Sequence, residues 1–277
     1  MGWIRIEGAA YWCCFVATFL AVAVWESVRP QRQLANGAEQ RWTRHGVLMV
    51  LSLITVSLLL RASPLAIAAI WVDSRYGLLN RPWLPYSLRI VAAILLLDLA
   101  QYWVHRTFHR VPWLWRVHEV HHSDPEYDVS TAARFHPLEA LGTQVVILGM
   151  VALLAPPVLA VFLAEMLKVV VNLLSHANAA FPAQVDAVVR AVFVTPSVHR
   201  IHHSEEIAEQ SSNFGQVFPW WDRLFGTYRA RPAKEHLVTG LRGFQTSASL
   251  ALTFMLSEPF QVREPQRGPA SDPGPLA

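Results

Sequence analysis

The chain has 277 residues, of which 53% are hydrophobic and only 16% are charged, a balance too apolar for an ordinary soluble domain. Its formal net charge is +3 and it contains no block of Lys and Arg, so we expect no nucleic acid partner. The two cysteines, Cys13 and Cys14, are adjacent within an apolar stretch, which excludes a disulfide framework and a cysteine metal site. A membrane protein is the first inference.

Six apolar runs predict an all-α fold, a polytopic membrane bundle of helices. In chain order they cover residues 9–25, 46–60, 64–72, 90–104, 141–156 and 158–174. The first run has no convincing cleavage site and predicts an uncleaved signal anchor. Between the last two runs, the sequence APP at residues 155–157 breaks the helical pattern and predicts a tight helical hairpin.

The orientation of the bundle is predicted from the connection between the first two runs. That connection carries four arginines: Arg29, Arg32, Arg41 and Arg44. If it is cytoplasmic, the run 90–104 ends in the cytoplasm at His105, and the hairpin returns there at His176. The opposite connection also carries arginines, at Arg61, Arg75 and Arg81. We expect a multi-pass protein of a bacterial inner membrane or endoplasmic reticulum, with a cytosolic helical cap that is rich in histidine.

The chain divides into three parts by composition. Residues 1–89 are predicted to be N-terminal transmembrane helices, and residues 90–240 a catalytic domain that includes the hairpin and the more polar loops and helices after residue 177. Residues 241–277 are predicted to hold one further helix and a disordered, Pro- and Gly-rich tail. The helical segment, residues 244–260, either lies along the membrane surface or packs on the catalytic region.

Eight of the twelve histidines lie in three short boxes, HRTFH, HEVHH and HRIHH. On a helix, residues i, i+3 and i+4 share a face, so each box directs its imidazoles toward one point. Pro112 and Pro196 each favour a new helix start, which gives the second and third boxes helical segments of their own. The isolated His45 and His236 are interpreted as ordinary structural histidines.

Polar side chains form a stripe along two of the apolar runs. The stripes are Asp98, Gln101, Tyr102, His105 and His109 in one run, and Glu165, Lys168, Asn172 and His176 in the other. Such stripes face a bundle interior or a cavity, not lipid. They could simply pair across the bundle, but both end at histidines on the same predicted side, which favours a shared site. Asp98, Gln101 and Asn172 would then support the metal ligands from behind. His136 could ligate, or could hydrogen-bond a ligand or substrate.

HEVHH fits two templates. Read as H-E-x-x-H it is a zinc hydrolase motif, with His118 and His122 on the metal and Glu119 as general base. Read as H-x-x-H-H it also supplies His121.

Eight or nine converging histidines exceed the four positions of a zinc site and point to two ions. A carboxylate-bridged di-iron bundle would need a second Glu-x-x-His unit, which we do not find. A non-enzymatic metal transporter or sensor is the other alternative. It would distribute its sites along a path across the bilayer, whereas these histidines gather at the ends of helices.

The three boxes in this order, with NLLSHAN before the last and SSNFG and WWDRLFGTY after it, resemble the fatty acid hydroxylase and sterol desaturase superfamily of membrane-bound non-haem di-iron enzymes. The resemblance covers about residues 94–232. It implies a di-iron centre in the cap, held by His105, His109, His118, His121, His122, His199, His202 and His203, with His176 as an additional ligand. It also implies that Asn213 and Asp222 shape the site and that Glu119 is a bystander.

The implied reaction is O₂-dependent hydroxylation or desaturation of a lipid taken from the bilayer, of the sterol, fatty acyl, ether lipid or carotenoid type. The two Fe ions would be the cofactor, and no catalytic residue is expected beyond the metal centre. The sequence shows no haem-binding Cys-x-x-Cys-His motif and no nucleotide-binding glycine fingerprint. We therefore expect electrons from a separate donor of the ferredoxin or cytochrome type.

Overall fold

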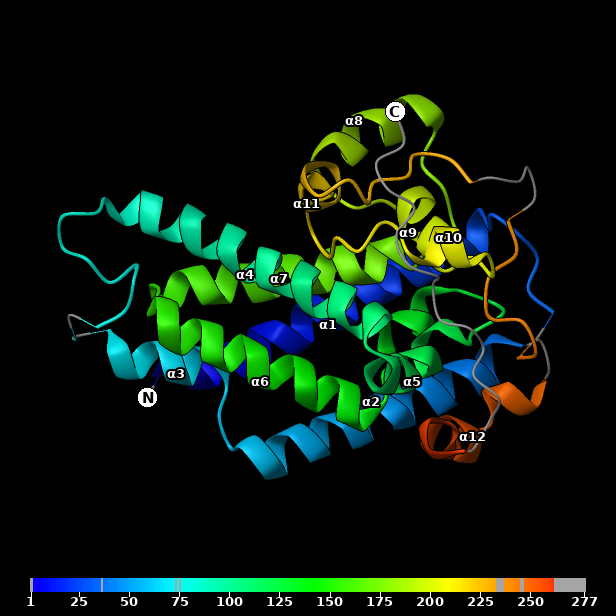
Figure 1. Cartoon of the computed structure of the whole chain (residues 1–277), viewed down its shortest axis with the longest axis horizontal. Coiled ribbons are helices and arrows are strands. Elements are labelled where there is room, and N and C mark those ends of the chain that lie inside the picture. The colour runs from blue at the N-terminus through cyan, green and yellow to red at the C-terminus, as the bar shows by residue number, and fades with distance from the viewer. Residues whose placement is uncertain are drawn as a thin grey trace.

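Long helices form one end of the molecule, and short helices with loops form the other (Figure 1). The computed structural model describes residues 2–35, 37–72, 74, 76–232, 237–244 and 247–261. The long helices are α1 Gly2–Val28, α2 Ala38–Leu60, α4 Tyr86–Arg110, α6 Pro137–Leu154 and α7 Val158–Ser175, with the shorter α3 Pro64–Trp71 beside them. Within the described residues the fold is all-helical, as predicted, apart from one isolated bridge between Ser204 and Thr239.

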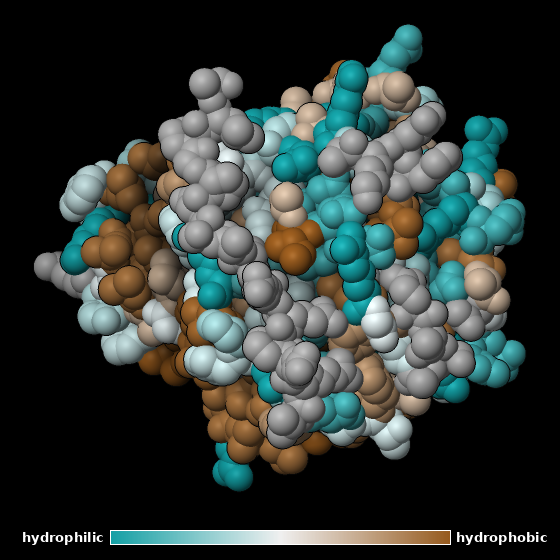
Figure 2. Space-filling view, turned by 45° about the vertical axis from the view of Figure 1, so that its right-hand side comes forward, coloured by the Kyte–Doolittle hydropathy of each residue, from teal (hydrophilic) through white to brown (hydrophobic). Residues whose placement is uncertain are grey.

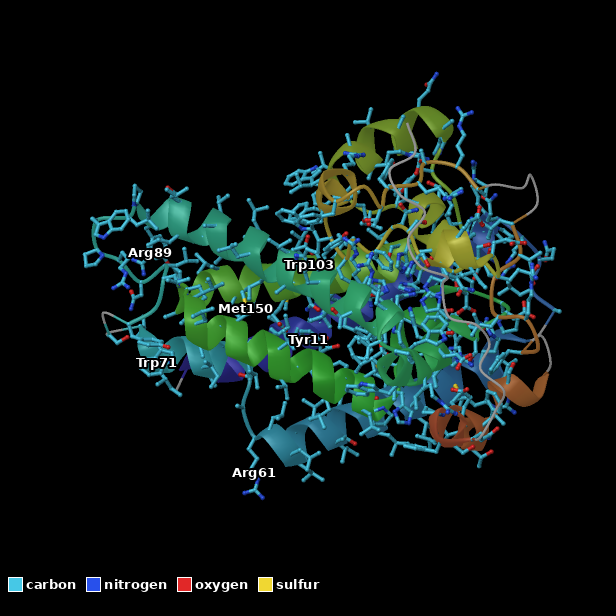
Figure 3. All side chains as sticks on the ribbon, in the orientation of Figure 1. Tyr11, Arg61, Trp71, Arg89, Trp103 and Met150 are labelled. Carbon is cyan, nitrogen blue, oxygen red and sulfur yellow. The ribbon has the colours of Figure 1, made fainter. Side chains whose placement is uncertain are left out.

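Five helical segments are long and apolar enough to cross a membrane. They are Gly8–Val28, Ala38–Trp71, Tyr86–Arg110, Pro137–Leu154 and Val158–Ser175. The second joins α2 and α3 across a break, where Arg61 adopts φ 48° and Ser63 caps α3 by accepting a hydrogen bond from the Ala66 backbone. Arg61 itself points away from the bundle (Figure 3).

The surface of the end with long helices differs from that of the end with short helices. Large apolar side chains such as Leu20, Leu58, Leu88 and Val145 are exposed on the long helices. In Figure 2 the brown, hydrophobic surface gathers at the left and bottom, and polar residues dominate the upper and right parts of the view. A broad exposed apolar surface on long helices is what a bilayer covers.

The α6–α7 connection is short, as the APP sequence predicted, but the two helices splay apart instead of forming a tight hairpin. Ala155 ends α6 in the left-handed region at φ 43°, and Pro157 immediately precedes α7. Helix α6 packs mainly against α2 and α4, helix α7 packs mainly against α1 and α4, and both also contact α3. Their shared core includes Ala93 and Leu97 of α4, Val151 of α6 and Val161 of α7. The hairpin prediction failed because small and apolar faces of α4 fit between the two helices.

The other end of the molecule, which we call the cap, contains short helices. These are α5 Pro112–His122, α8 Ala183–Val192, α9 Pro196–His202, α10 Ile207–Gln210, α11 Trp220–Leu224 and α12 Leu252–Ser257, with 3₁₀ turns at Val129–Ala133, Ser247–Leu250 and Glu258–Phe260. Helix α12 packs on α2 and α5: Met255 is buried against Leu48 of α2 and Val120 of α5. The predicted tail beyond residue 261, and His236, lie outside the described residues.

The arginine-rich connection between α1 and α2 lies at the cap end of the molecule. Arg32 donates to the backbone oxygens of Pro125 (2.8 Å) and Glu126. Arg41, fully buried, pairs with Asp124 (2.7 Å) and with Asp128. These contacts fix the connection and the histidines on the same side of the bundle, whichever side of a membrane that is.

Candidate metal centre

The chain turns sharply just before each histidine helix of the cap. Helix α4 ends at Arg110, Val111 is extended, and Pro112 opens α5 at its first position. Helix α9 likewise starts at Pro196 after the extended Thr195. Proline favours the first helical turn and holds the preceding residue extended, so each box starts a new helix direction. His105 and His109, on the last turns of α4, therefore meet the histidines of α5 and α9.

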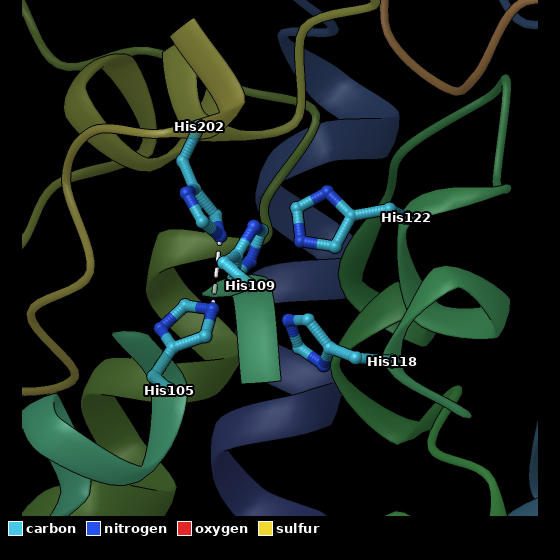
Figure 4. Close-up of side chains that lie close together, drawn as sticks. All are labelled: His105, His109, His118, His122 and His202. Carbon is cyan, nitrogen blue, oxygen red and sulfur yellow. Dashed lines mark hydrogen bonds between the residues drawn. The ribbon is translucent and has the colours of Figure 1, made fainter. Parts of the chain in front are cut away.

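The nine predicted histidines form two buried groups. In each group the candidate ligand atoms all lie within 4.8 Å of one another. The group of five contains His105, His109, His118, His122 and His202, whose rings converge in Figure 4. The group of four contains His121, His176, His199 and His203.

The second and third boxes each contribute to both groups. His118 and His122 of HEVHH belong to the group of five, whereas His121 belongs to the group of four. The rings of His122 and His203 stack at 4.4 Å across the boundary. The two groups are therefore neighbours. The pair His118 and His122 that a zinc hydrolase would use shares its group with three further imidazoles, one more donor than a four-coordinate zinc site accepts.

Hydrogen bonds to groups outside the two histidine groups fix the ring orientation of four histidines. The Nδ1 atom donates to a backbone oxygen in three of them: His105 to Phe214 (2.8 Å), His202 to Ser212 (2.7 Å) and His176 to Asn172 (2.8 Å). In the fourth, His118 Nδ1 lies 2.6 Å from Glu139 Oε1. A carbonyl oxygen can only accept, so in the first three the proton is on Nδ1 and Nε2 presents its lone pair inward.

One contact tests whether these residues suit a metal. His105 Nε2 and His202 Nε2 lie 2.9 Å apart, the dashed line in Figure 4. Both rings already donate through Nδ1, so two lone pairs face each other with no proton between them. A cation removes that repulsion. Metal–nitrogen bonds of about 2.1 Å at near right angles set neighbouring ligand atoms about 3 Å apart, which matches this spacing. The donor set fits a bound metal.

Buried ring nitrogens without a partner support the same conclusion. Among the described residues they include His109 Nε2, His118 Nε2, His121 Nδ1, His199 Nδ1 and both nitrogens of His122 and His203. Buried polar atoms nearly always have a hydrogen-bond partner in folded proteins. Such a concentration of unpartnered nitrogens in one place indicates that a ligand completes the site.

Burial keeps the cap histidines neutral, which is the form that binds metal. Burial lowers the pKa of His118 to about 3 and that of His176 to about 4. Burial, followed by the mutual repulsion of neighbouring imidazolium charges, also lowers the pKa well below its ordinary value in His121, His122, His199, His202 and His203. At neutral pH their lone pairs are available.

The residues predicted to support the ligands act mostly through the backbone. Asp98 accepts from the backbone of Val217 and Phe218 and from the Trp221 indole, and Asp222 accepts from the backbone of Phe214 and Gly215. Together they hold the loop whose Phe214 oxygen orients His105. Burial raises the pKa of Asp222 to about 6.

Asn213, Asn172 and Gln101 take three different positions. Asn213 adopts φ 54° and its amide donates to the backbone of Val198 and Arg229, which shapes the turn after Ser212. The Asn172 side chain donates to the Ala132 oxygen, and only its backbone oxygen contacts His176. Gln101 faces a hollow in the bundle.

His136 lies apart from both groups. Its Nδ1 accepts from the Leu138 backbone (3.2 Å) at the start of α6, and its ring is 6.0 Å from that of Phe260. His45 has a structural setting, as expected: it contacts Ser130 Oγ (2.8 Å) and Arg134 (3.0 Å). Arg134 in turn donates to the Val120 oxygen and so supports α5.

Glu139 is the site residue that the sequence analysis missed. Its carboxylate is buried against His118, as carboxylates that orient metal-binding imidazoles are. A signal was present: it is an acidic residue in the first turn of an otherwise apolar helix, where burying a charge is costly. Phe214 and Ser212 were also missed, because a backbone oxygen leaves no mark on the sequence.

The fold and the paired groups define a multi-pass membrane protein with a buried, histidine-rich site suited to metal. Residues 90–227 match the family model described as fatty acid hydroxylase, and this part of the chain belongs to that family. The predicted superfamily is thus confirmed. The family assignment explains the order of the boxes but does not set the number of metal ions.

Curated relatives with the same region include several lipid enzymes. An ornithine lipid hydroxylase of Rhizobium tropici is 29% identical over 178 residues, which are 64% of this chain and 51% of the relative. Human alkylglycerol monooxygenase is 31% identical over 176 residues, 62% of this chain and 37% of the relative. Rat cholesterol 25-hydroxylase is 26% identical over 153 residues, which are 54% of this chain and 50% of the relative. The chain spans about half or less of these proteins, and no solved structure matches.

Proposed function

We propose that the chain is a membrane-bound non-haem di-iron monooxygenase that hydroxylates an unactivated C–H position of a lipid, with O₂ as co-substrate. The observation that carries the proposal is the pair of adjacent groups, five and four neutral histidines, in which the lone pairs of His105 and His202 face each other at 2.9 Å. Nitrogen ligands suit iron among other metals. The relatives named for hydroxylation and monooxygenation favour hydroxylation over desaturation.

Bound iron would supply the activation of O₂ that attack on an unactivated C–H bond requires. The protein's contribution is to hold the ligands and exclude water. Nδ1 protons held at Phe214, Ser212 and Asn172 keep the opposing nitrogens free to ligate, and Glu139 holds His118. Burial of all nine rings keeps the site dry, which protects a reactive centre from side reactions.

The overall reaction inserts one oxygen atom into the C–H bond and releases the other as water, which consumes two electrons and two protons. We propose that a separate ferredoxin- or cytochrome-type donor supplies the electrons. We also propose that the cap is cytoplasmic, in a bacterial inner membrane or endoplasmic reticulum. The arginines of the α1–α2 connection, which lie at the cap, favour that side.

The experiment that tests the proposal compares lipid extracts of cells that express the chain with extracts of cells that express the His202→Ala variant. We expect lipid species that have gained one oxygen atom, only with the unaltered protein and only under O₂, and two irons in the purified protein. Zinc in place of iron, with no oxidised lipid, would exclude the proposal. A loss of two hydrogens would identify desaturation instead.

A further inference from the structure

A narrow hollow lies inside the bundle, between the splayed helices α6 and α7 and beside α4. Its polar wall residues are Asp98 and Gln101 of α4 and Glu165 and Lys168 of α7; apolar side chains such as Ile147 and Val161 form much of the rest. Polar and ionisable side chains in a membrane helix cost free energy to bury, so they usually mark a functional site. The Asp98 carboxylate is already occupied by the 217–221 loop.

Glu165 and Lys168 differ from Asp98. They lie three residues apart on one face of α7, and both border the hollow. Among the described residues neither has a hydrogen bond or an ion pair, although Lys168 attracts Glu165 at longer range. Tyr11 of α1, which lies among the long helices in Figure 3, also interacts electrostatically with Glu165. A carboxyl and an amine that share one helix face and one hollow without pairing are both available to a third group.

The charges of the two residues restrict what that group can be. A phosphate or carboxylate would be attracted by Lys168 but repelled by Glu165, and an ammonium group would meet the reverse. A neutral group that donates one hydrogen bond and accepts another satisfies both side chains. A hydroxyl or an amide has this property.

The hollow also has a defined relation to the metal centre. Gln101 precedes His105 by four residues on α4, or about 6 Å along the helix axis. Lys168 precedes His176 by eight residues, or about 12 Å. Gln101, which is buried, thus lies between the polar pair and the histidines. None of the described residues that line the hollow is a histidine, so a lipid anchored at Glu165 and Lys168 would have to extend past Gln101 to reach the metal centre.

We propose that this hollow binds the substrate lipid through a hydroxyl or amide group, which donates to Glu165 and accepts from Lys168. The inference rests on the proposed function, because it assigns the hollow to the same lipid. It specifies a neutral, hydrogen-bonding lipid whose polar group lies about 12 Å before His176 along α7, the axial distance between Lys168 and His176.

The test uses the full chain in phosphatidylcholine nanodiscs and a diazirine-bearing hexadecanamide as a photo-crosslinking probe. Unlabelled hexadecanamide and hexadecanol should displace the probe at concentrations about tenfold or more below those of hexadecane and hexadecyl phosphate, as expected for hydrogen bonds to charged groups. The crosslinked peptides should come from α4, α6 or α7. Equal displacement by hexadecane would overturn the inference.

Two matched double variants separate binding from folding. Glu165→Met with Lys168→Met makes the wall apolar and should abolish the preference for hexadecanamide. Glu165→Lys with Lys168→Glu exchanges the two groups and should retain the preference within a few-fold, because an amide can donate and accept in either direction. An apolar variant that keeps the full preference would overturn the inference.

Iron content and lipid oxidation are measured on the same samples, so that the two proposals fail separately. If the protein retains iron and oxidises lipid but shows no preference for the amide, the lipid-binding proposal is wrong and the enzyme proposal stands. If it prefers the amide but binds no iron and oxidises nothing, the enzyme proposal is wrong and the binding site stands.

Discussion

The two histidine groups are built differently although they share two boxes. In the group of five, three rings are fixed by hydrogen bonds from Nδ1: His105, His118 and His202. In the group of four, only His176 has such an anchor. Among the described residues, the ring nitrogens of His121 and His199 contact only the Nε2 atom of His176, at 3.3 and 3.2 Å, and have no hydrogen bond to a group outside the two histidine groups. Ring packing holds the rest, for example His121 stacked on Phe135 at 4.5 Å and His203 packed on Tyr127 at 4.9 Å.

This difference bears on how firmly each group should hold an ion. An imidazole fixed by a hydrogen bond has its tautomer and direction set in advance, whereas one held by packing must be ordered by the metal itself. We therefore infer that the group of five is the more rigid site. On the proposed function, an ion held by the group of four would exchange more readily.

The largest expected effect comes from deleting one ligand in each group. His202→Ala and His121→Ala should each abolish lipid oxidation, and each should lower the iron content from two ions per chain to one or none. Metal analysis of the purified variants checks this, with His45→Gln as a control that leaves both groups intact. If His121→Ala kept two irons and full turnover, the two-group description would be wrong.

Next in size is Glu139→Gln, which removes the carboxyl group that anchors His118. Loss of a carboxylate behind a metal-binding imidazole costs about tenfold to a hundredfold in metal affinity or activity. The matched change in the other group is Asn172→Ala. It should cost no more than a few-fold, because the anchor of His176 is the backbone oxygen, which the substitution retains. Iron-binding titrations of the two variants measure the contrast, and equal losses would contradict it.

Chelation should separate the two groups in the unaltered protein. On dialysis against a graded series of a ferrous chelator, we expect the iron to leave in two steps, with the less anchored group of four losing its ion first. His176→Ala should speed the first step only. A single step for both ions, unaffected by that substitution, would remove the distinction between the groups.

Acid should destabilise the metal-free protein through the cap histidines. Burial depresses their pKa, to about 3 for His118 and about 4 for His176. The unfolded chain, with an ordinary histidine pKa of about 6.5, therefore takes up protons first as the pH falls. The contribution of these histidines to stability should be constant above about pH 7 and fall steadily from about 6.5 downward; it outweighs the opposite contribution of Asp222, because nine histidines act together. Denaturant unfolding at a series of pH values measures it; greater stability at pH 5 than at pH 7 would contradict the assignment.

The smallest effect is expected for Glu119→Gln. Glu119 is buried on α5 beside His118, but the group assignments do not require its carboxylate. Lipid oxidation should change no more than a few-fold. The zinc hydrolase interpretation of HEVHH needs this residue as general base, so a collapse of turnover in the variant would revive it.

Local patterns determined much of this protein in advance. The apolar runs predicted the long helices because each membrane helix must satisfy its own backbone and cover itself with apolar side chains. The i, i+3, i+4 spacing of the boxes predicted that their eight histidines would converge, because that spacing places side chains on one helix face, and the polar stripe of α7 added His176. The polar stripe on α7 correctly predicted that Glu165 and Lys168 face a cavity.

Only the tertiary structure decided how those pieces combine. HEVHH gives no indication that His121 joins one group and His118 and His122 another, since that division depends on how α5 meets α4 and α9. The same holds for Phe214, Ser212 and Glu139, which contact the histidines across 10 to 109 positions of sequence, the first two through backbone oxygens. The splay of α6 and α7 around α4 likewise depends on side-chain packing between helices. Spacing fixes which residues share a face, but the partner of each face is set by packing between distant segments.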